Sequence, residues 1–359
     1  LLNAWTSIGE QHQCRVGKAH LKVFVTGGAG YIGSHVVVEL VKHGYEVVIF
    51  DNFSNASSNV PTALSELCGV QITVTSGDLR DASALECVFS DHSIDAVMHF
   101  AGLKSVAESV ADPLMYYDNN VLGSLQLCKS MRKYDVKRLV FSSSATVYGD
   151  PISVPIREDA PAVNPTNPYG MTKVICEKMV LDLCRSDPSF SAGILRYFNP
   201  VGAHPSGLIG EDPKGQPANL MPLLTNAAAD PTAVLKIYGC DYPTKDGTGV
   251  RDYIHVCDLA AGHVAALNRC STDSQHFIAN LGTGNGFSVL EVIRAFEQAC
   301  GIKIAYQIAP RRPGDVAICY ADTSYATEFL NWRAEKTLKD MCLDSWRWQE
   351  QNSLLGSHM

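Results

Sequence analysis

Residues 22–33 read KVFVTGGAGYIG, and this stretch decides the fold class of the chain. The apolar run 22–26 is typical of a buried strand, and residues 34–43 are typical of a helix that stops at Gly44. The glycines between them let the backbone turn sharply and approach a pyrophosphate, whose charge the N-terminus of a helix stabilises. This order of strand, glycine loop and helix predicts a dinucleotide-binding unit. A glycine turn required only for helix–sheet packing is the alternative.

Outward from this unit, short apolar runs alternate with helical stretches. The runs have the continuous hydrophobicity of strands buried on both faces, and they cover residues 46–51, 95–100, 137–142 and 193–198. We therefore predict an α/β protein with a Rossmann-type, doubly wound parallel sheet. After residue 199 glycine and proline become frequent and the alternation becomes irregular. We expect residues 21–198 to form the dinucleotide-binding domain and residues 199–350 to form mainly a smaller substrate-binding lobe, with some segments free to return to the first domain.

The composition excludes several classes of protein. With 46% hydrophobic residues among 359, the chain has enough apolar material for a large core, so it is neither disordered nor collagen-like. Its 29 basic and 37 acidic residues give a net charge of -8, which repels phosphate backbones and anionic membrane surfaces. We therefore expect neither nucleic acid nor a membrane among its partners.

The cysteines and the two ends of the chain add further expectations. The twelve cysteines form no C-x-x-C pair and lack the spacing of a zinc site, so we expect no metal. Free thiols in apolar helical patterns, without a signal pattern or a membrane-spanning apolar run, predict a cytoplasmic protein. Residues 1–20 are treated as an extension, and residues 356–359, GSHM, resemble a cloning remnant.

Asp51 ends the second apolar run, at the position where a dinucleotide site presents a ribose ligand. A carboxylate there hydrogen-bonds a free 2′-hydroxyl and repels a 2′-phosphate. The sequence therefore predicts NAD, and not NADP, as the cofactor, held by Asp51 and by Gly27, Gly30 and Gly33 of the loop.

Tyr169 and Lys173 stand four residues apart at the start of a predicted helix, so they share a face. A phenol titrates near pH 10, and a tyrosine base at neutral pH needs its pKa lowered by about three units, equivalent to about 4 kcal/mol. A lysine ammonium and a nicotinamide cation can supply this stabilisation, and Ser144 at the end of another strand can hold a substrate oxygen. A solvated helix face is the alternative, which the preceding nucleotide loop and serine-ended strand disfavour.

Longer motifs make a family resemblance specific. They are TGGAGYIGSH at 26–35, HFAGLK at 99–104, YYDNN at 116–120, SSSATVYG at 142–149 and RYFNPVGAHPSG at 196–207. The chain resembles the UDP-glucose 4-epimerases, which are extended short-chain dehydrogenases/reductases, from about residue 21 to residue 348.

The resemblance implies an NAD-dependent isomerase that interconverts UDP-galactose and UDP-glucose. In that family Tyr169 would take the proton of the sugar 4-hydroxyl while hydride passes to NAD. Lys173 would lower the tyrosine pKa and hold the nicotinamide ribose, and Ser144 would orient the sugar oxygen. The 4-keto sugar would then turn over and take hydride back on its opposite face, which requires a firm grip on UDP and a loose one on the hexose.

The resemblance also assigns binding residues. For NAD it adds to the glycines and Asp51 the residues Tyr31, Ile32, Asn52, Asp78, Leu79, Phe100, Lys104, Asn119, Tyr169, Lys173 and Phe198. For the UDP-sugar it implies Ser144, Asn199, Asn219, Lys236, Ile237, Tyr238, Arg251, Arg312, Asp315 and Cys319. Guanidinium groups suit bidentate diphosphate binding, although ordinary surface ion pairs are the alternative for Arg251 and Arg312.

Cys319 stands where some members of the family carry a tyrosine against the hexose. The smaller side chain suggests that the N-acetylated sugars UDP-GalNAc and UDP-GlcNAc are also substrates. The alternative is that Cys319 only packs, with backbone shifts that close the gap.

Two other functions are considered. A nucleotide-sugar 4,6-dehydratase needs an acid pair where this chain has Ala145 and Thr146, so its elimination chemistry is missing. A non-catalytic NAD or sugar-nucleotide sensor would not need Ser144, Tyr169 and Lys173. Apolar faces in residues 105–117 and 169–183 suggest a homodimer, although they could equally be core faces.

Overall fold

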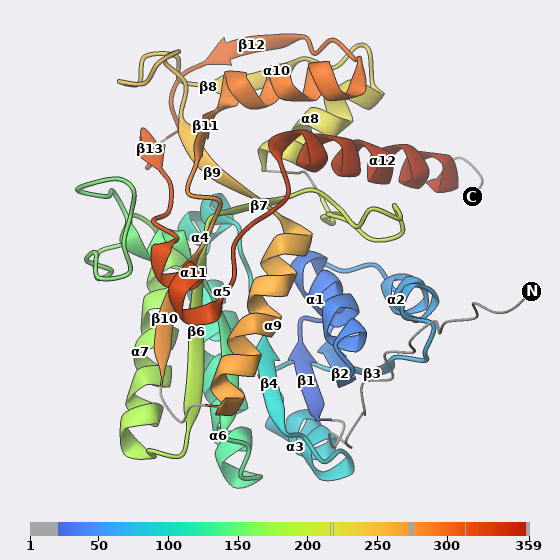
Figure 1. Cartoon of the computed structure of the whole chain (residues 1–359), viewed down its shortest axis with the longest axis vertical. Coiled ribbons are helices and arrows are strands. Elements are labelled where there is room, and N and C mark those ends of the chain that lie inside the picture. Colours follow the sequence, from blue (N-terminus) through green and yellow to red (C-terminus); the bar gives the residue numbers. More distant parts are fainter. Residues whose placement is uncertain (1–20, 216, 218, 273–275, 313, 357–359) are drawn as a thin grey trace, which may run out of the picture.

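A computed structural model describes residues 21–215, 217, 219–272, 276–312 and 314–356 (Figure 1). The predicted extension at residues 1–20 and most of the predicted remnant, residues 357–359, lie outside the described residues. The molecule consists of a large parallel sheet between two layers of helices, with a smaller lobe above one edge of that sheet (Figure 1).

The large sheet has seven strands in the order β10-β6-β5-β4-β1-β2-β3, and all neighbouring strands are parallel. The strands are β1 (Lys22–Thr26), β2 (Glu46–Asp51), β3 (Thr73–Ser76), β4 (Ala96–His99), β5 (Arg138–Ser144), β6 (Ser191–Tyr197) and β10 (Phe277–Leu281). The chain order reverses between β1 and β4, which makes the sheet doubly wound and confirms the predicted α/β class.

Helices cover both faces of this sheet, as its apolar strands require. One layer contains α1 (Tyr31–Lys42), α2 (Val60–Cys68), α9 (Val256–Thr272) and α11 (Ser324–Leu330). The other layer contains α3 (Ala82–Asp91), α6 (Gly123–Lys133) and α7 (Pro168–Ser186). Between β4 and α6 the chain forms α4 (Val106–Ala111), α5 (Pro113–Tyr116) and a π-helical turn, η1 (Tyr117–Leu122); the 3₁₀ turn η2 (Ala145–Tyr148) follows β5.

The smaller lobe is built from two short sheets and three helices around a separate apolar cluster. The first sheet contains β7 (Asn199–Val201), β9 (Val250–His255), β11 (Gly286–Ser288) and β13 (Ile318–Cys319); the second pairs β8 (Leu235–Tyr238) with β12 (Tyr306–Ala309). The helices are α8 (Leu220–Ala229), α10 (Val289–Cys300) and α12 (Leu338–Gly356).

The segment that forms α9 and β10 comes from the chain after residue 199 and yet belongs to the large sheet. β10 pairs with β6 from Phe277↔Gly193 to Leu281↔Tyr197, and α9 packs against α1. The chain therefore crosses between the two parts more than once, which places residues from both parts along the same edge of the sheet (Figure 1).

The first helix begins earlier than expected, at Tyr31 instead of Ser34, and so includes the last glycine of the loop. A Cβ at Gly33 would lie 2.2 Å from the carbonyl oxygen of Gly27, a backbone atom that no rotamer change can move. Gly27 itself has φ +70°, which a residue with a side chain rarely adopts. The glycines therefore allow the helix N-terminus to pack directly on the loop.

Candidate active site

The glycine loop and Asp51 form one unit at the carboxyl edge of the sheet. The Asp51 carboxylate accepts hydrogen bonds from the backbone N–H of Ala29 at 3.0 Å and of Phe53 at 2.9 Å. Burial raises the pKa of Asp51, and these backbone donors oppose that shift. The acid therefore lies directly beside the loop that is expected to hold a pyrophosphate, and the missing Cβ of Gly33 lets the N-terminus of α1 lie against that loop, as a dinucleotide site requires.

Asn52 and Asp78 lie side by side at the ends of neighbouring strands. The Asn52 amide donates to the Asp78 carboxylate at 3.2 Å, and Arg80 binds both Asp78 and Asp118. The Arg80 guanidinium holds the pKa of Asp78 well below its usual value, so this acid is charged at neutral pH. Its contact with an adenine edge stays a prediction.

The three predicted catalytic residues come from two elements that end or begin at this same edge. β5 ends at Ser144, and α7 begins at Pro168 with the side chain of Asn167 as its cap, accepting from Gly170 N–H at 2.9 Å. Tyr169 and Lys173 are both buried, and the Lys173 ammonium donates to the carbonyl oxygen of Ser142 at 2.7 Å. The cation lies 6.0 Å from the centroid of the Tyr169 ring.

Burial works against both ionised forms that the predicted chemistry needs. It raises the pKa of Tyr169, and the hydrogen bond with Ser144 lowers that pKa only in part. It lowers the pKa of Lys173 to about 8, because an ammonium is poorly solvated there. The side chains alone therefore do not bring the phenol to neutral pH, and the positive charge of an oxidised nicotinamide ring beside Tyr169 would act in the required direction.

Asn120, in the π-helical turn η1, joins the loop after β4 to the catalytic helix. Its side-chain oxygen accepts from Leu103 N–H at 2.8 Å, and its amide donates to the Leu103 carbonyl and to the Thr172 hydroxyl. Its neighbour Asn119, which was assigned to NAD, is partly exposed on the same turn. π-Helical turns are frequent at functional sites, and this one holds Phe100–Lys104 in place.

The predicted UDP-binding residues of the smaller lobe include two arginines. Arg251 in β9 lies 3.8 Å from Asp315, and its backbone is paired with Cys319 in β13. Arg312 stacks on Tyr238, with the guanidinium carbon 3.9 Å from the ring centroid. Arg251 thus lies near an acid and Arg312 over an aromatic ring, and the binding of a diphosphate by either guanidinium stays a prediction.

The other residues of the smaller lobe that are predicted to contact UDP differ in their solvent exposure. Asn199, Asn219 and Lys236 are exposed. Ile237 is different, because its side chain is buried at 1% exposure in the apolar cluster of the lobe. Only the backbone of Ile237 is therefore available to a uracil base.

Cys319 connects the lobe with the catalytic strand. It packs against the apolar cluster that includes Ala145, Val147 and Phe198, and Ala145 directly follows Ser144. Burial raises the pKa of its thiol to about 11, so it is a neutral side chain at this position. The structure thus places Cys319 against an apolar cluster that contains the residue after Ser144.

The sequence analysis missed Glu211, which lies between predicted cofactor and substrate residues. Its carboxylate accepts from the Lys104 ammonium at 2.8 Å and from the Asn219 amide at 2.9 Å. No sequence pattern marks this acid, because the loop that carries it has no regular spacing and its partners lie in distant segments.

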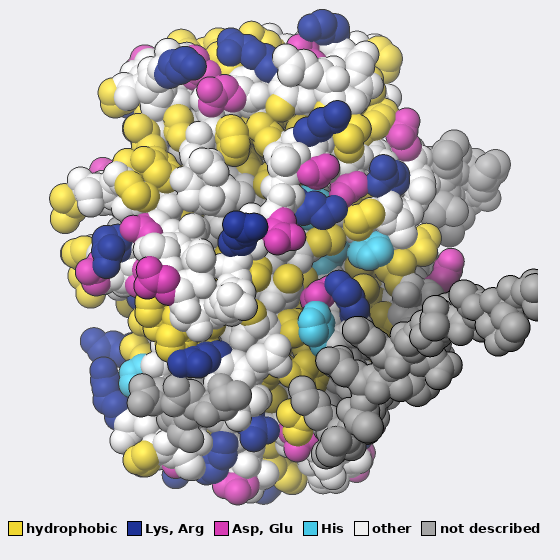
Figure 2. Space-filling model, viewed as in Figure 1, with side chains coloured by type: hydrophobic (Ala, Val, Ile, Leu, Met, Phe, Trp, Pro, Cys, Tyr) yellow, Lys and Arg dark blue, Asp and Glu magenta, His cyan; other side chains and the backbone are white. Residues whose placement is uncertain are grey.

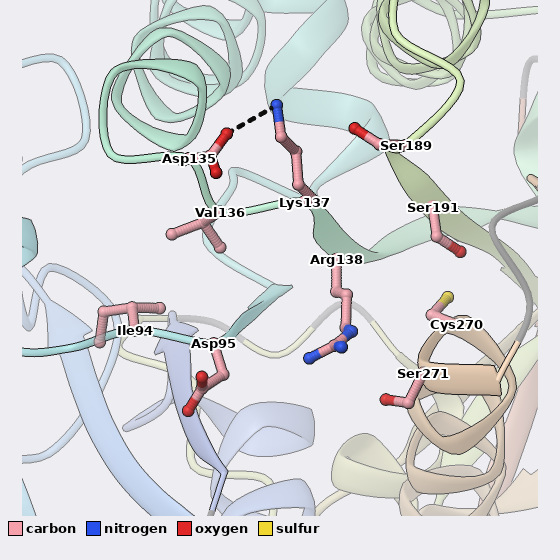
Figure 3. Close-up of a pocket in the computed structure, with 10 residues that line it drawn as sticks. All are labelled: Ile94, Asp95, Asp135, Val136, Lys137, Arg138, Ser189, Ser191, Cys270 and Ser271. Atoms are coloured by element: carbon pink, nitrogen blue, oxygen red, sulfur yellow. Dashed lines mark ion pairs between the residues drawn. The ribbon is translucent and has the colours of Figure 1, made fainter.

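A separate cavity of about 410 Å³ lies at the opposite, amino-terminal edge of the large sheet (Figure 3). Its lining includes Asp95 before β4, Lys137 and Arg138 at the start of β5, and Ser191 at the start of β6. None of the predicted site residues lines it, and Lys137 is paired with Asp135 at 2.9 Å (Figure 3). The cavity is therefore distinct from the candidate active site.

Comparisons with known proteins identify the family of the chain. Residues 23–282 match the model of the NAD dependent epimerase/dehydratase family. The UDP-glucose 4-epimerase of Bacillus subtilis is 53% identical over 332 residues, which are 92% of this chain and 98% of that protein. The chain belongs to the UDP-glucose 4-epimerase family.

Solved structures of this family superpose on most of the chain. The Bifidobacterium longum UDP-glucose 4-epimerase, in complex with NAD+ and UDP, has a TM-score of 0.90 at 51% identity and covers 92% of this chain and 99% of its own. The UDP-Glc/GlcNAc 4-epimerase of Campylobacter jejuni has a TM-score of 0.80 at 34% identity, with 92% and 99% covered. The predicted family, isomerase class and NAD cofactor are confirmed.

Other properties of the epimerase follow from the described residues alone. They contain no helix with the length and apolar character of a bilayer span. They also contain no group of three or more histidine, cysteine or acidic side chains arranged to hold a metal ion. On the face in Figure 2 basic and acidic side chains lie beside each other.

Asp51→Ala tests the ribose assignment. Because the charged acceptor is lost, we expect NAD affinity to fall about tenfold or more, and Asp51→Asn to bind NADP better than the unchanged protein does. Fluorescence titration of cofactor-stripped protein measures both affinities, and Asp230→Ala, at an exposed turn of the smaller lobe, is the control. NAD affinity unchanged in Asp51→Ala would show that the ribose is bound elsewhere.

Proposed function

We propose that this protein interconverts UDP-galactose and UDP-glucose through a transient 4-keto sugar, with Ser144, Tyr169 and Lys173 as its catalytic residues. The supporting observation is that these three side chains meet at the carboxyl edge of the sheet, where the glycine loop and Asp51 also lie. The glycine loop and Asp51 would hold NAD there, and the bound cofactor would supply a reversible hydride acceptor for carbon 4 of the sugar, so that no external oxidant would be consumed.

The proton steps fall to the chain's own side chains. The Tyr169 phenolate takes the proton of the 4-hydroxyl and gives it back after the sugar has turned. Ser144 orients the same oxygen, and its own hydroxyl accepts a hydrogen bond from Thr146 Oγ1 at 3.0 Å, which limits its rotation. Lys173, held by the Ser142 carbonyl, supplies the positive charge that stabilises the phenolate.

Binding is divided between the two parts of the molecule. We propose that residues 21–198, with α9 and β10, hold NAD, and that residues 199–255 and 286–350 hold the UDP-sugar. The glycine loop, Asp51 and the segment Phe100–Lys104 lie on the first part, and Arg251 and Arg312 lie on the second. A diphosphate fixed by two arginines leaves the hexose free to turn, which inversion requires.

The two other functions considered have weaker support. η2 begins with Ala145 and Thr146 directly after Ser144, where a dehydratase would need acids for elimination. A sensor would not require a buried lysine and tyrosine, which are costly to ionise at this depth. Incubation with UDP-galactose alone distinguishes all three: UDP-glucose indicates an epimerase, a keto-deoxy sugar a dehydratase, and no turnover a sensor.

Tyr169→Phe tests the catalytic assignment. Because the phenol that takes and returns the proton of the 4-hydroxyl is lost, we expect kcat to fall about 100- to 10,000-fold. A coupled assay of UDP-glucose formed from UDP-galactose measures it. Tyr134→Phe removes a hydroxyl that donates to the Glu86 carbonyl, on α3 and far from the site, and it should keep full activity. Undiminished turnover by Tyr169→Phe would refute the mechanism.

We further propose that UDP-GalNAc and UDP-GlcNAc are substrates, since Cys319 is a small side chain packed against the apolar cluster that contains Ala145, the residue after Ser144. Cys319→Tyr should abolish turnover of the N-acetylated sugars and change turnover of UDP-galactose only a few-fold, because the larger ring fills the space of the acetamide. Product analysis by chromatography measures both, with Cys319→Ser as the size-conserving control. Retained UDP-GlcNAc turnover in Cys319→Tyr, or none in the unchanged protein, would contradict the proposal.

We also propose a homodimer formed through α4 and α5. Apolar side chains are exposed along these helices: Val106 at 41%, Val110 at 62% and Leu114 at 77%. Such a row at the protein surface favours association with a second copy.

Val110→Glu should convert the dimer into a monomer, because a buried charge would be unpaired at the interface. Analytical ultracentrifugation measures the mass in solution. Ile152→Glu changes an apolar side chain that is 91% exposed in the loop after η2, and it should leave the dimer intact. A monomeric unchanged protein would remove the proposal.

A cytoplasmic location remains part of the proposed function. Every described cysteine is free, including the buried Cys128, Cys176 and Cys184 of the large domain. Free thiols persist where the environment is reducing, which supports this location.

A further inference from the structure

A buried ion pair lies directly behind the catalytic residues. Arg196 in β6 donates from Nε to Glu177 Oε1 at 3.0 Å and from Nη2 to Oε2 at 2.7 Å. Both side chains are buried, with exposures of 5% and 6%. Glu177 lies on α7 four residues after Lys173 and eight after Tyr169, so all three share one helix face.

The same carboxylate also binds the strand that ends at Ser144. The Ser143 hydroxyl donates to Glu177 Oε1 at 2.5 Å, and Ser143 is paired with Arg196 in the register of β5 and β6. Glu177 therefore accepts from both strands at the level of the residue before Ser144. One side chain thus sets the position of the catalytic helix relative to the catalytic serine.

The other end of Arg196 is also fully bonded. Its Nη1 donates to the Tyr148 hydroxyl and to the Glu158 carbonyl, each at 3.2 Å, and Tyr148 donates to Asn280 Oδ1 at 2.7 Å. Asn280 in turn donates to the carbonyl of Ile156 at 2.9 Å. The guanidinium is therefore bonded by Tyr148 of η2 and by Glu158 of the loop between η2 and α7, and Asn280 of β10 holds Tyr148 in turn.

A buried ion pair is weak evidence for stability, because removing two charges from water offsets most of their attraction. Glu177 accepts hydrogen bonds from Ser143 on β5 and from Arg196 on β6, and both strands border the site. This geometry can fix the position of α7 relative to those strands. We propose that Glu177 and Arg196 are positioning residues of the epimerase reaction, and that they fix Ser144 relative to Tyr169 and Lys173. This inference rests on the proposed function.

Glu177 also contributes to the charge environment of Lys173. The titratable groups around Lys173 are Tyr169, Cys176 and Glu177 on α7, His99 on β4, and Arg196 and Tyr197 on β6. Burial raises the pKa of Cys176 and Tyr197 and lowers that of His99 to about 3, so these three are neutral at pH 7. Burial lowers the pKa of Lys173 to about 8, and the nearby Cys176 and the negative charge of Glu177 oppose that shift, so Glu177 favours the ammonium that the phenolate requires.

Glu177→Gln keeps the shape of the side chain and removes its charge. We expect kcat for UDP-galactose to fall about 10- to 100-fold, because the helix and the serine lose their common anchor. The apparent KM should stay within about twofold, since the UDP-binding residues lie in the other lobe. Without the negative charge the pKa of Lys173 falls, so the alkaline limb of the kcat–pH profile should move to lower pH.

Two further variants separate positioning from stability. Ser143→Ala removes one donor and keeps the charge, so kcat should fall by a smaller factor with the alkaline limb unmoved. Glu177→Gln combined with Arg196→Met removes the unpaired buried arginine and should restore thermal stability without restoring kcat. Asp344→Asn removes the acid of a buried pair with His255 in the smaller lobe, and it controls for a general loss of stability.

The results for these variants distinguish failure of the positioning role from failure of the proposed function. Wild-type kcat in Glu177→Gln, or recovery of kcat in the double variant, would overturn the positioning role. If Glu177→Gln does not fold, Ser143→Ala decides: a kcat equal to that of the unchanged protein overturns the proposal, and a lowered kcat with unchanged KM supports it. Absence of epimerase activity in the unchanged protein would instead contradict the proposed function.

Discussion

The arrangement of this protein depends on one geometric constraint: the carboxyl ends of parallel strands and the N-termini of the helices that follow them meet at a single edge of the sheet. At that edge β1 leads through the glycine loop into α1, β2 ends at Asp51, and β5 ends at Ser144. Close packing of α1 on the loop is allowed only because Gly33 has no Cβ. A side chain there would push the helix away from the position in which it can face a pyrophosphate.

Burial at this edge opposes the charges that the proposed reaction needs. A water-excluded pocket strengthens electrostatic interactions, yet it disfavours the ionised forms of Tyr169 and Lys173. The Ser142 carbonyl and the charge of Glu177 support the ammonium, but the side chains alone do not bring the phenol to neutral pH. In the proposed mechanism the positive charge of a bound oxidised nicotinamide would supply the remaining stabilisation of the phenolate.

Much of this could be predicted from local sequence. The apolar runs identified β1, β2, β4, β5 and β6, because strands buried on both faces are continuously hydrophobic. The four-residue spacing of Tyr169 and Lys173 predicted a shared helix face, and the position of Asp51 at the end of a strand predicted a ribose ligand, which the structure places beside the glycine loop. β10 was not assigned to the large sheet, because its place beside β6 depends on a long-range pairing that leaves no local pattern.

The kinds of chemical group at the site, and their order along the chain, were therefore encoded locally, in glycine spacing, strand hydrophobicity and helix periodicity. Tertiary structure alone decided which distant groups surround them: Cys319 beside the residue after Ser144, Glu211 between Lys104 and Asn219, and Arg196 bonded to Glu177. The physical reason is that periodicity reports which face of an element is buried, whereas a hydrogen bond or an ion pair depends on how separate elements pack in space.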